Sequence, residues 1–201
     1  MISKPKYKIA RRLGAPIFEK TQTQKYAARA ERKVKTRGFS KPKSEYGLQH
    51  NEKQKARMQY GVSEKQFSGY VKSALEKKAA LAVPAIFESL ELRLDNAVYR
   101  LGFAPTRRAA RQMVSHGHIT VNDKKTSVPS RRLIIGDSLA IRPGSADSAL
   151  FKSWSERVDA ITIPEWLTLD MKSKKAEVKG IPKSTGDLLF DLNAVVEFYS
   201  R

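Results

Sequence analysis

The clearest periodic pattern of hydrophobic and polar positions lies between residues 90 and 123. Four large apolar residues recur at spacings of four, four and three positions: Leu90, Leu94, Val98 and Leu101. This spacing predicts one helix with a single apolar face. Gly102 follows as a candidate for the helix end, and the Ala104-Pro105 pair prevents the helix from continuing.

A second short helix is predicted directly after this one. Thr106 is suited to cap it through its hydroxyl group. Its apolar side carries Ala110, Met113 and Val114, and Gly117 would end it. The β-branched run 119–121 then predicts a strand, and residues 122–125 (Asn-Asp-Lys-Lys) predict the turn of a hairpin.

Further helices are predicted on both sides of this region. A basic helix starts at Asn51 or an earlier residue and stops near Tyr60-Gly61. Ser63 caps the next helix with Gln66 in a capping box. The apolar face of that helix is Phe67, Tyr70, Val71, Ala74 and Leu75. Residues 133–142 predict a strand, a Gly-Asp turn and a second strand, and residues 187–199 predict a terminal helix.

The first 50 residues are rich in Lys, Arg, Gln and Ser and poor in large apolar side chains. Alone, such a segment is expected to be extended or disordered and to become ordered on a polyanion. A solvated tail is the alternative. We expect a short helix over residues 27–35 and an extended or turn segment over residues 41–47.

Positive charge is concentrated in two blocks of the chain. The formal net charge is +19; residues 1–65 hold 18 Lys/Arg against 5 Asp/Glu, and residues 93–132 hold 9 against 2. Charge grouped in this way is typical of a protein that binds a polyanion. A membrane surface is disfavoured because no long basic amphipathic helix accompanies the charge.

The second predicted helix carries three arginines close together. Arg107, Arg108 and Arg111 fall within about one and a quarter turns, so three guanidinium groups can address one phosphate backbone. Free backbone N–H groups at the helix start favour the same anion. An RNA backbone is the obvious acceptor, and a solvated basic helix face is the alternative.

Several classes of site are excluded by composition. The chain has no cysteine, so disulfides are impossible, which agrees with a reducing compartment. No apolar run is long enough to span a bilayer, and the N-terminus lacks the apolar centre of a secretory signal. We therefore expect a cytoplasmic protein. The sequence contains no G-x-x-x-x-G-K-[ST] phosphate-binding loop, no H-E-x-x-H and no G-x-S-x-G motif. The three histidines, His50, His116 and His118, are not expected to form a metal site.

Two stretches carry a resemblance to a known family. Residues 90–123, LELRLDNAVYRLGFAPTRRAARQMVSHGHITVND, resemble the core of the S-four RNA-binding domain. Residues 44–74, SEYGLQHNEKQKARMQYGVSEKQFSGYVKSA, resemble the helical first domain of the bacterial-type small-subunit ribosomal protein S-four family. Some relatives in this family carry a zinc site built from cysteines, which this chain lacks.

The resemblance implies an α+β fold in which an RNA-binding domain, two short helices packed on a small, mostly antiparallel sheet, is inserted into a helical domain. We expect a basic N-terminal extension (1–43), a helical domain (44–88), the inserted S-four-type domain (89–184) and a C-terminal helix (185–201) that packs back on the helical domain. The expected RNA-binding residues are Lys53, Lys55, Arg57, Arg93, Arg100, Thr106, Arg107, Arg108, Arg111, Gln112, Ser115, His116, His118, Asn122, Lys124, Arg131 and Arg132. For the two histidines, turn hydrogen bonds are the alternative role.

The resemblance implies a structural role and no enzymatic activity or cofactor. The family binds 16S-type ribosomal RNA early in subunit assembly, lies near the messenger RNA entry channel, contributes to translational accuracy and touches neighbouring ribosomal proteins. The main enzymatic alternative is a pseudouridine synthase, because Arg93-Leu94-Asp95 matches the catalytic R-L-D of those enzymes. A helix-surface ion pair is the favoured interpretation of Asp95. A DNA-binding helix-turn-helix is a third alternative, disfavoured by the strand that follows at once.

Overall fold

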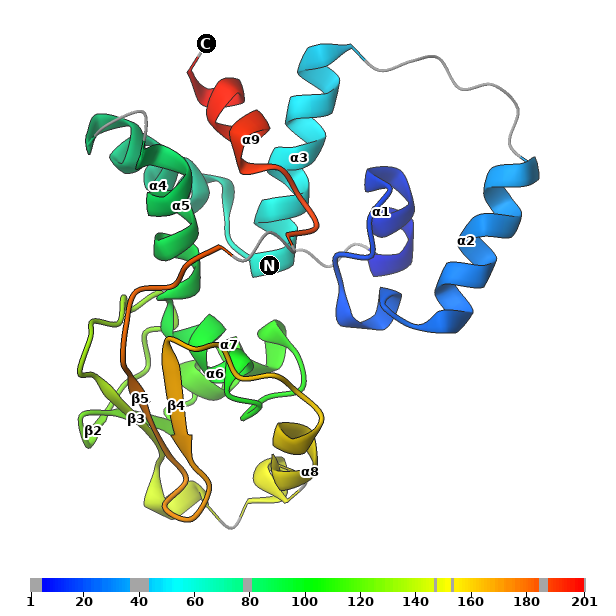
Figure 1. Ribbon diagram of the computed structural model, residues 1–201. Coiled ribbons are helices and arrows are strands. Elements are labelled where there is room, and N and C mark those ends of the chain that lie inside the picture. Colours follow the sequence, from blue (N-terminus) through cyan, green and yellow to red (C-terminus); the bar gives the residue numbers. More distant parts are fainter. Residues whose placement is uncertain are drawn as a thin grey trace. The chain divides into compact units, whose positions relative to one another are not determined.

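The computed structural model describes residues 5–36, 44–77, 81–146, 148–152, 154–184 and 188–200. Contacts within the chain divide it into two compact units, shown in Figure 1. The first unit combines the described parts of Met1–Ile86 and Ser184–Arg201, and the second is Phe87–Lys183. Each unit is described by itself.

The first unit is built from helices. They are α1 (Lys6–Leu13), α2 (Gln24–Thr36), α3 (Glu45–Tyr60), α4 (Glu64–Lys77), the start of α5 (Ala82–Glu91) and α9 (Leu192–Tyr199). Helix α9 packs along α3 and also contacts α4, so the last helix of the chain completes a unit that the first helices begin.

The N-terminal segment differs from the expectation of an extended or disordered tail. Residues 6–13 form α1, and Ile9, Leu13 and Ile17 are buried together with Met58 of α3. The expectation was wrong here because these few apolar residues fall on one side of a short helix and meet a partner on a distant helix. The short helix expected over residues 27–35 lies within α2, which is longer.

Helices α3 and α4 begin at hydroxyl caps. The Ser44 hydroxyl accepts a hydrogen bond from the Gly47 N–H, so α3 starts six residues before Asn51, and the extended segment predicted there is wrong from residue 45 onward. Residues 41–43 lie outside the described residues. Ser63 accepts from the Gln66 N–H as predicted, and its own hydroxyl bonds to the Gln66 side chain.

The second unit contains a five-stranded sheet and short helices. The strands are β1 (Ile119–Val121), β2 (Lys124–Lys125), β3 (Ser138–Ile141), β4 (Leu167–Asp170) and β5 (Lys175–Val178); the helices are the end of α5, α6 (Leu94–Arg100), α7 (Arg107–Ser115) and α8 (Trp154–Asp159). The strand order is β2-β1-β3-β5-β4 and every pairing is antiparallel. The α+β class is therefore confirmed.

One hydrophobic core joins the helices of this unit to its sheet. Leu94, Val98 and Leu101 come from α6 and its end, Ala110, Met113 and Val114 from α7, Trp154 and Val158 from α8, and Ile119, Leu139 and Val178 from the strands. Helices α6 and α7 therefore pack on one face of the sheet (Figure 1). The core fixes the orientation of α7, whose other side carries the arginines.

The predicted helix over residues 90–101 is interrupted. Helix α5 ends at Glu91 and α6 starts at Leu94, with Arg93 in an extended conformation between them. Here the chain pairs with a distant segment: the Leu133 N–H donates to the Leu92 carbonyl and the Leu94 N–H to the Arg131 carbonyl. The apolar positions are buried as predicted, but the single helix is wrong because this long-range pairing replaces two helical hydrogen bonds.

The turns of the second unit follow the local sequence closely. Asn122 and Asp123 both have positive φ angles of 51° and 59°, which places the hairpin turn at these two residues and Lys124–Lys125 in β2. Gly102 has a φ of 68° and follows the end of α6 as predicted. The strand predicted at 133–135 is wrong, because only β3 forms after the Gly136-Asp137 turn.

Candidate nucleic-acid interface

Helix α7 presents its arginines away from the core. The Thr106 hydroxyl accepts a hydrogen bond from the Ala109 N–H at 3.1 Å and caps the helix as predicted. Arg108 is exposed, whereas Arg107 and Arg111 are partly buried. Because the opposite side of α7 is locked in the core, the helix carries these three side chains on a rigid support.

Arg107 is held by two neighbours from α6. Its Nε donates to Asn96 Oδ1 at 2.9 Å, and its guanidinium carbon lies 4.4 Å from the centre of the Tyr99 ring. Stacking of a guanidinium group on an aromatic face is favourable and leaves the edge of the group available. The contacts restrict Arg107 to one region of the surface.

Arg100 is clamped by a buried carboxylate. Its Nε and Nη2 donate to the two oxygens of Glu91 at 3.0 and 2.7 Å, and Asn96 Nδ2 donates to the same carboxylate at 2.9 Å. The Glu91 side chain is 1% exposed, whereas that of Arg100 is 32% exposed. The negative charge is therefore buried below the surface and the positive charge reaches it.

Arg93 and Asp95 form a second, deeper ion pair. Arg93 donates through Nε and Nη2 to the two oxygens of Asp95 at 2.9 and 2.7 Å, and Arg111 Nη1 lies 3.8 Å from Asp95 Oδ2. The assignment of Arg93 to the RNA contacts is wrong, because Arg93 is 1% exposed. The ion pair expected at Asp95 exists, but it is buried instead of lying on the helix surface. Its two carboxylate oxygens are both bound to arginine, which also argues against a catalytic role.

The other predicted residues of this unit fall into two groups. Gln112, Ser115, His116, Lys124 and Arg132 are exposed, and Arg132 forms an ion pair with Glu88. Three more have internal partners: Arg131 donates to Thr126, the His118 ring is 3.0 Å from the Ser145 hydroxyl, and Asn122 donates to Asp137. Burial, and then the nearby His116 and Arg142, lower the pKa of His118.

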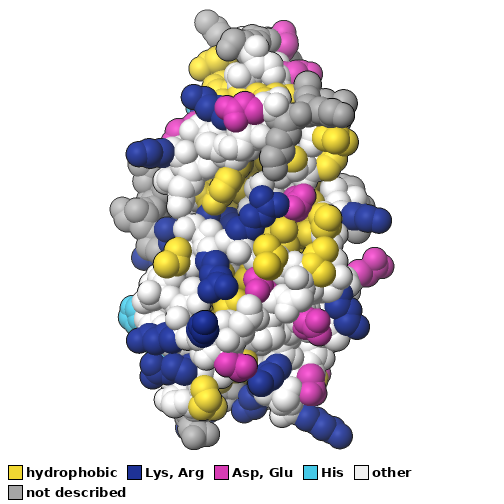
Figure 2. Space-filling model, turned by 90° about the vertical axis from the view of Figure 1, so that its left-hand side faces the viewer, with side chains coloured by type: hydrophobic (Ala, Val, Ile, Leu, Met, Phe, Trp, Pro, Cys, Tyr) yellow, Lys and Arg dark blue, Asp and Glu magenta, His cyan; other side chains and the backbone are white. Residues whose placement is uncertain are grey.

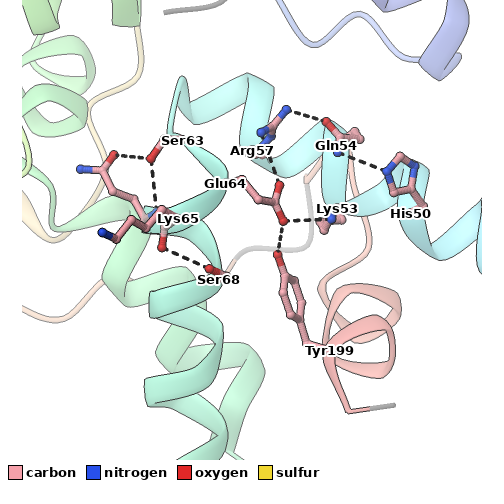
Figure 3. Close-up of polar contacts among 10 residues, drawn as sticks. His50, Lys53, Gln54, Arg57, Ser63, Glu64, Lys65, Ser68 and Tyr199 are labelled. Carbon is pink, nitrogen blue, oxygen red and sulfur yellow. Dashed lines mark hydrogen bonds and ion pairs between the residues drawn. The ribbon is translucent and has the colours of Figure 1, made fainter.

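In the first unit, two of the predicted basic residues point inward (Figure 3). Lys53 Nζ lies 2.9 Å from Glu64 Oε1 and 4.3 Å from the centre of the Phe198 ring. Arg57 reaches the other Glu64 oxygen at 3.3 Å and donates to Gln54 at 2.8 Å. Lys53 is buried, so its predicted contact with RNA is wrong. Its position follows from partners on α4 and α9.

The same cluster shifts the titration of its members. Burial raises the pKa of Glu64, but hydrogen bonds from Lys53 and Tyr199 and the charges of Lys53 and Arg57 outweigh it, so the pKa lies below its ordinary value. Burial, and then the hydrogen bond to Glu64, raise the pKa of Tyr199 far above its ordinary range. Burial and the Lys53 charge lower the pKa of His50.

Lys55, the third predicted residue of α3, pairs with Glu52 at 2.6 Å.

Three residues that contact Arg100 or Arg107 were not predicted as part of the site: Glu91, Asn96 and Tyr99. A usable signal for Glu91 is its place in the run Leu90-Glu91-Leu92, since a carboxylate within apolar neighbours needs a buried partner. Asn96 and Tyr99 gave no such signal, because their role depends on how α6 packs beside α7.

Figure 2 shows Lys and Arg side chains on one face of the molecule, interspersed with hydrophobic and acidic side chains. Within the described residues, no group of His, Cys, Asp or Glu is arranged to hold a metal ion. No helix in the described part of the chain is long and apolar enough to cross a membrane.

Comparison with known proteins identifies two family matches. Residues 2–88 match the Ribosomal protein S4/S9 N-terminal domain, and residues 92–139 match the S4 domain. The chain is 38% identical to the small ribosomal subunit protein uS4 of Akkermansia muciniphila over 98% of this chain and 97% of that protein. It is 40% identical to uS4 of Aquifex aeolicus and 41% to uS4 of Roseiflexus sp., again over 98% of this chain and 97% of each relative. The chain therefore belongs to the uS4 family of small ribosomal subunit proteins.

Proposed function

We propose that this protein is a structural component of the small ribosomal subunit that binds 16S-type ribosomal RNA directly. In this role it nucleates early subunit assembly in the cytoplasm, contacts neighbouring ribosomal proteins, and contributes to translational accuracy beside messenger RNA at the entry channel. The family membership supports the general role. The observation that carries the RNA-binding role is the set of arginines on α7, mounted opposite a buried core face.

The chemistry of this surface suits a folded RNA. Guanidinium groups bind phosphate oxygens in a fixed, forked geometry, and each phosphate that is neutralised releases counterions. Because α7 is fixed by its core contacts, the backbone positions from which Arg107, Arg108 and Arg111 project are set before RNA arrives. A surface of fixed spacing favours an RNA whose phosphates already match it, so the shape of the RNA provides the selectivity.

The first unit supplies a second basic surface. With Lys53 buried, this surface consists of exposed residues from α1, the following turn and α2: Lys8, Arg11, Arg12, Lys20, Lys25 and Arg29. Two basic surfaces on one chain allow the protein to hold two parts of a folded RNA. We also propose that the S-four-type module, residues 89–184, is an insertion in the helical domain, which the packing of α9 on α3 supports.

The test is quantitative binding of the full-length protein to a folded 16S rRNA fragment over a range of salt concentrations. Replacement of Arg107, Arg108 and Arg111 by Ala should weaken binding strongly and lower the slope of log K against log salt by about one unit for each phosphate that is no longer neutralised. Unchanged binding by the triple variant would exclude α7 from the interface.

The matched control replaces three exposed lysines of the same unit, Lys152, Lys172 and Lys179, by Ala. It removes the same charge, so it should weaken binding to folded and unstructured RNA alike and much less than the α7 variant. Mass spectrometry of the recovered RNA addresses the enzymatic alternative, and a modified base would overturn the structural role.

A further inference from the structure

The arginine surface of the second unit has negative charge directly beneath it. Glu91 and Asp95 are buried carboxylates that contact arginines from below, in a region expected to attract a polyanion. We propose that Glu91, Asp95 and Asn96 are positioning residues for RNA recognition, which rests on the function proposed above. They hold three guanidinium groups in place before RNA arrives: Arg100, Arg107 and Arg111.

Glu91 and Asn96 together position two of these groups. Glu91 binds Arg100 through two parallel hydrogen bonds, which fix both the place and the plane of the guanidinium group. Asn96 donates to Glu91 at 2.9 Å and accepts from Arg107 at 2.9 Å. Asn96 Nδ2 also donates to the Glu91 backbone carbonyl at 3.1 Å, so the carboxylate and the backbone of Glu91 together fix which end of the Asn96 amide faces Arg107. Replacing the carboxylate alone therefore releases Arg100 and leaves the Asn96 amide oriented.

Asp95 plays the corresponding part for Arg111. Its two oxygens are bound by the buried Arg93, which fixes the carboxylate, and Arg111 lies 3.8 Å from one of them. Asp95 thus presents a fixed negative charge to a side chain that starts on α7. Arg93 acts through Asp95 and has no direct access to RNA.

The burial pattern separates this arrangement from ordinary surface ion pairs. The carboxylate side chains are 1% and 6% exposed, whereas those of Arg100 and Arg111 are each 32% exposed. The carboxylates therefore cannot approach a phosphate, whereas the two arginine side chains are partly exposed. Each of these arginines thus combines a contact with a buried carboxylate and partial exposure to solvent.

Two opposite effects follow for RNA binding. The buried negative charge weakens the attraction to any RNA, folded or unstructured, because its repulsion of the phosphates depends only on their distance from it. Ordering the arginines in the free protein favours only an RNA whose phosphates match their positions. Binding of such an RNA then costs less side-chain entropy, which raises its affinity by about threefold to tenfold for each ordered arginine. The ratio of affinities for folded and unstructured RNA isolates the second effect.

The experiment compares E91Q with E165Q in the full-length protein. Glu165 is exposed in the same unit, so both variants lose one negative charge. For E91Q, the ratio of association constants for a folded 16S rRNA fragment and for single-stranded poly-U should fall by about threefold to tenfold. For E165Q the ratio should stay constant, and E91D, which keeps the charge, should recover part of it. An equal ratio in E91Q and E165Q overturns the proposal.

Fluorescence of Trp154 and Trp166, which lie in the core of this unit, shows whether E91Q folds. If it does not fold, a second measurement on the wild type still tests the proposal. Nitrogen-15 relaxation of the arginine Nε groups in the RNA-free wild type should show Arg100 to be ordered and the exposed Arg108 to be mobile. Equal mobility of the two overturns the proposal. Failure of the wild type to prefer folded rRNA would instead overturn the proposed function, and the relaxation result would still stand.

Discussion

The two units use the same kind of ion pair in opposite orientations. In the first unit the cation is buried: the Lys53 side chain is 9% exposed and its partner Glu64 is 45% exposed. In the second unit the anion is buried: the Glu91 side chain is 1% exposed and its partner Arg100 is 32% exposed. Of these two pairs, the one in the second unit brings its cation to the surface, whereas the one in the first unit buries it.

The difference shows that a count of basic residues does not identify a binding surface. Lys53 interacts with Glu64 and with the aromatic rings of α9, so its charge stabilises contacts between helices. Arg100 and Arg107 are bound from below by Glu91 and Asn96 and are partly exposed. The position of the acidic or amide partner decides which way the cation faces.

The largest effect is expected from Asp95→Asn. The substitution removes the negative charge that pairs with the guanidinium group of Arg93, which is 1% exposed, and breaking a buried ion pair in this way destabilises a protein by about 3–5 kcal/mol. Urea unfolding followed by tryptophan fluorescence measures this loss, because both tryptophans, Trp154 and Trp166, lie in the core of the second unit. A decrease in the free energy of unfolding below about 1 kcal/mol, the value typical of exposed ion pairs, would mean that the Arg93 charge is solvated in the folded protein.

A smaller effect is expected from Lys53→Met in the first unit. Methionine fills a similar space, and the carboxylate that loses its partner, Glu64, is 45% exposed and stays hydrated. Loss of one charged hydrogen bond and of the interaction with Phe198 should cost about 1–2 kcal/mol. Amide hydrogen exchange of α9 measures the cost. A loss as large as that of Asp95→Asn would contradict the distinction between the two units.

The smallest effect is expected from acid pH on the first unit. Because the pKa of Glu64 is lowered in the folded protein, its contribution is fully present above its ordinary value of 4.5 and is lost as the pH falls through the lower folded value. Exchange protection of α9 should therefore weaken as the pH falls below about 4.5. In E64Q this part of the pH dependence should disappear. An unchanged profile would show that titration of Glu64 does not cause the loss of protection.

The features that the sequence predicted correctly depend on neighbouring residues. The Thr106 cap, the buried side of α7 and the helix end next to Gly102 each follow from a few adjacent positions. The turn at Asn122-Asp123 belongs to the same group, since these residue types tolerate the left-handed conformation that a tight hairpin requires.

The features that the sequence did not predict depend on partners far along the chain. The break at Arg93 requires the segment around Arg131, and the burial of Lys53 requires Tyr199 and its neighbours on α9. Helix α1 was missed because its apolar residues need Met58 to form a core. A single sequence shows which side chains carry charge, but the facing partner is set by the tertiary fold.

The packing of α9 on α3 has a consequence for co-translational folding of the protein. Residues 45–60 emerge early, whereas residues 192–199 emerge only after all of the second unit. Since domains generally fold as units while the chain is being made, the S4 module can acquire its native structure first. Until α9 emerges, one side of α3 in the helical unit stays uncovered, so the direction of synthesis sets the order in which the two units are completed.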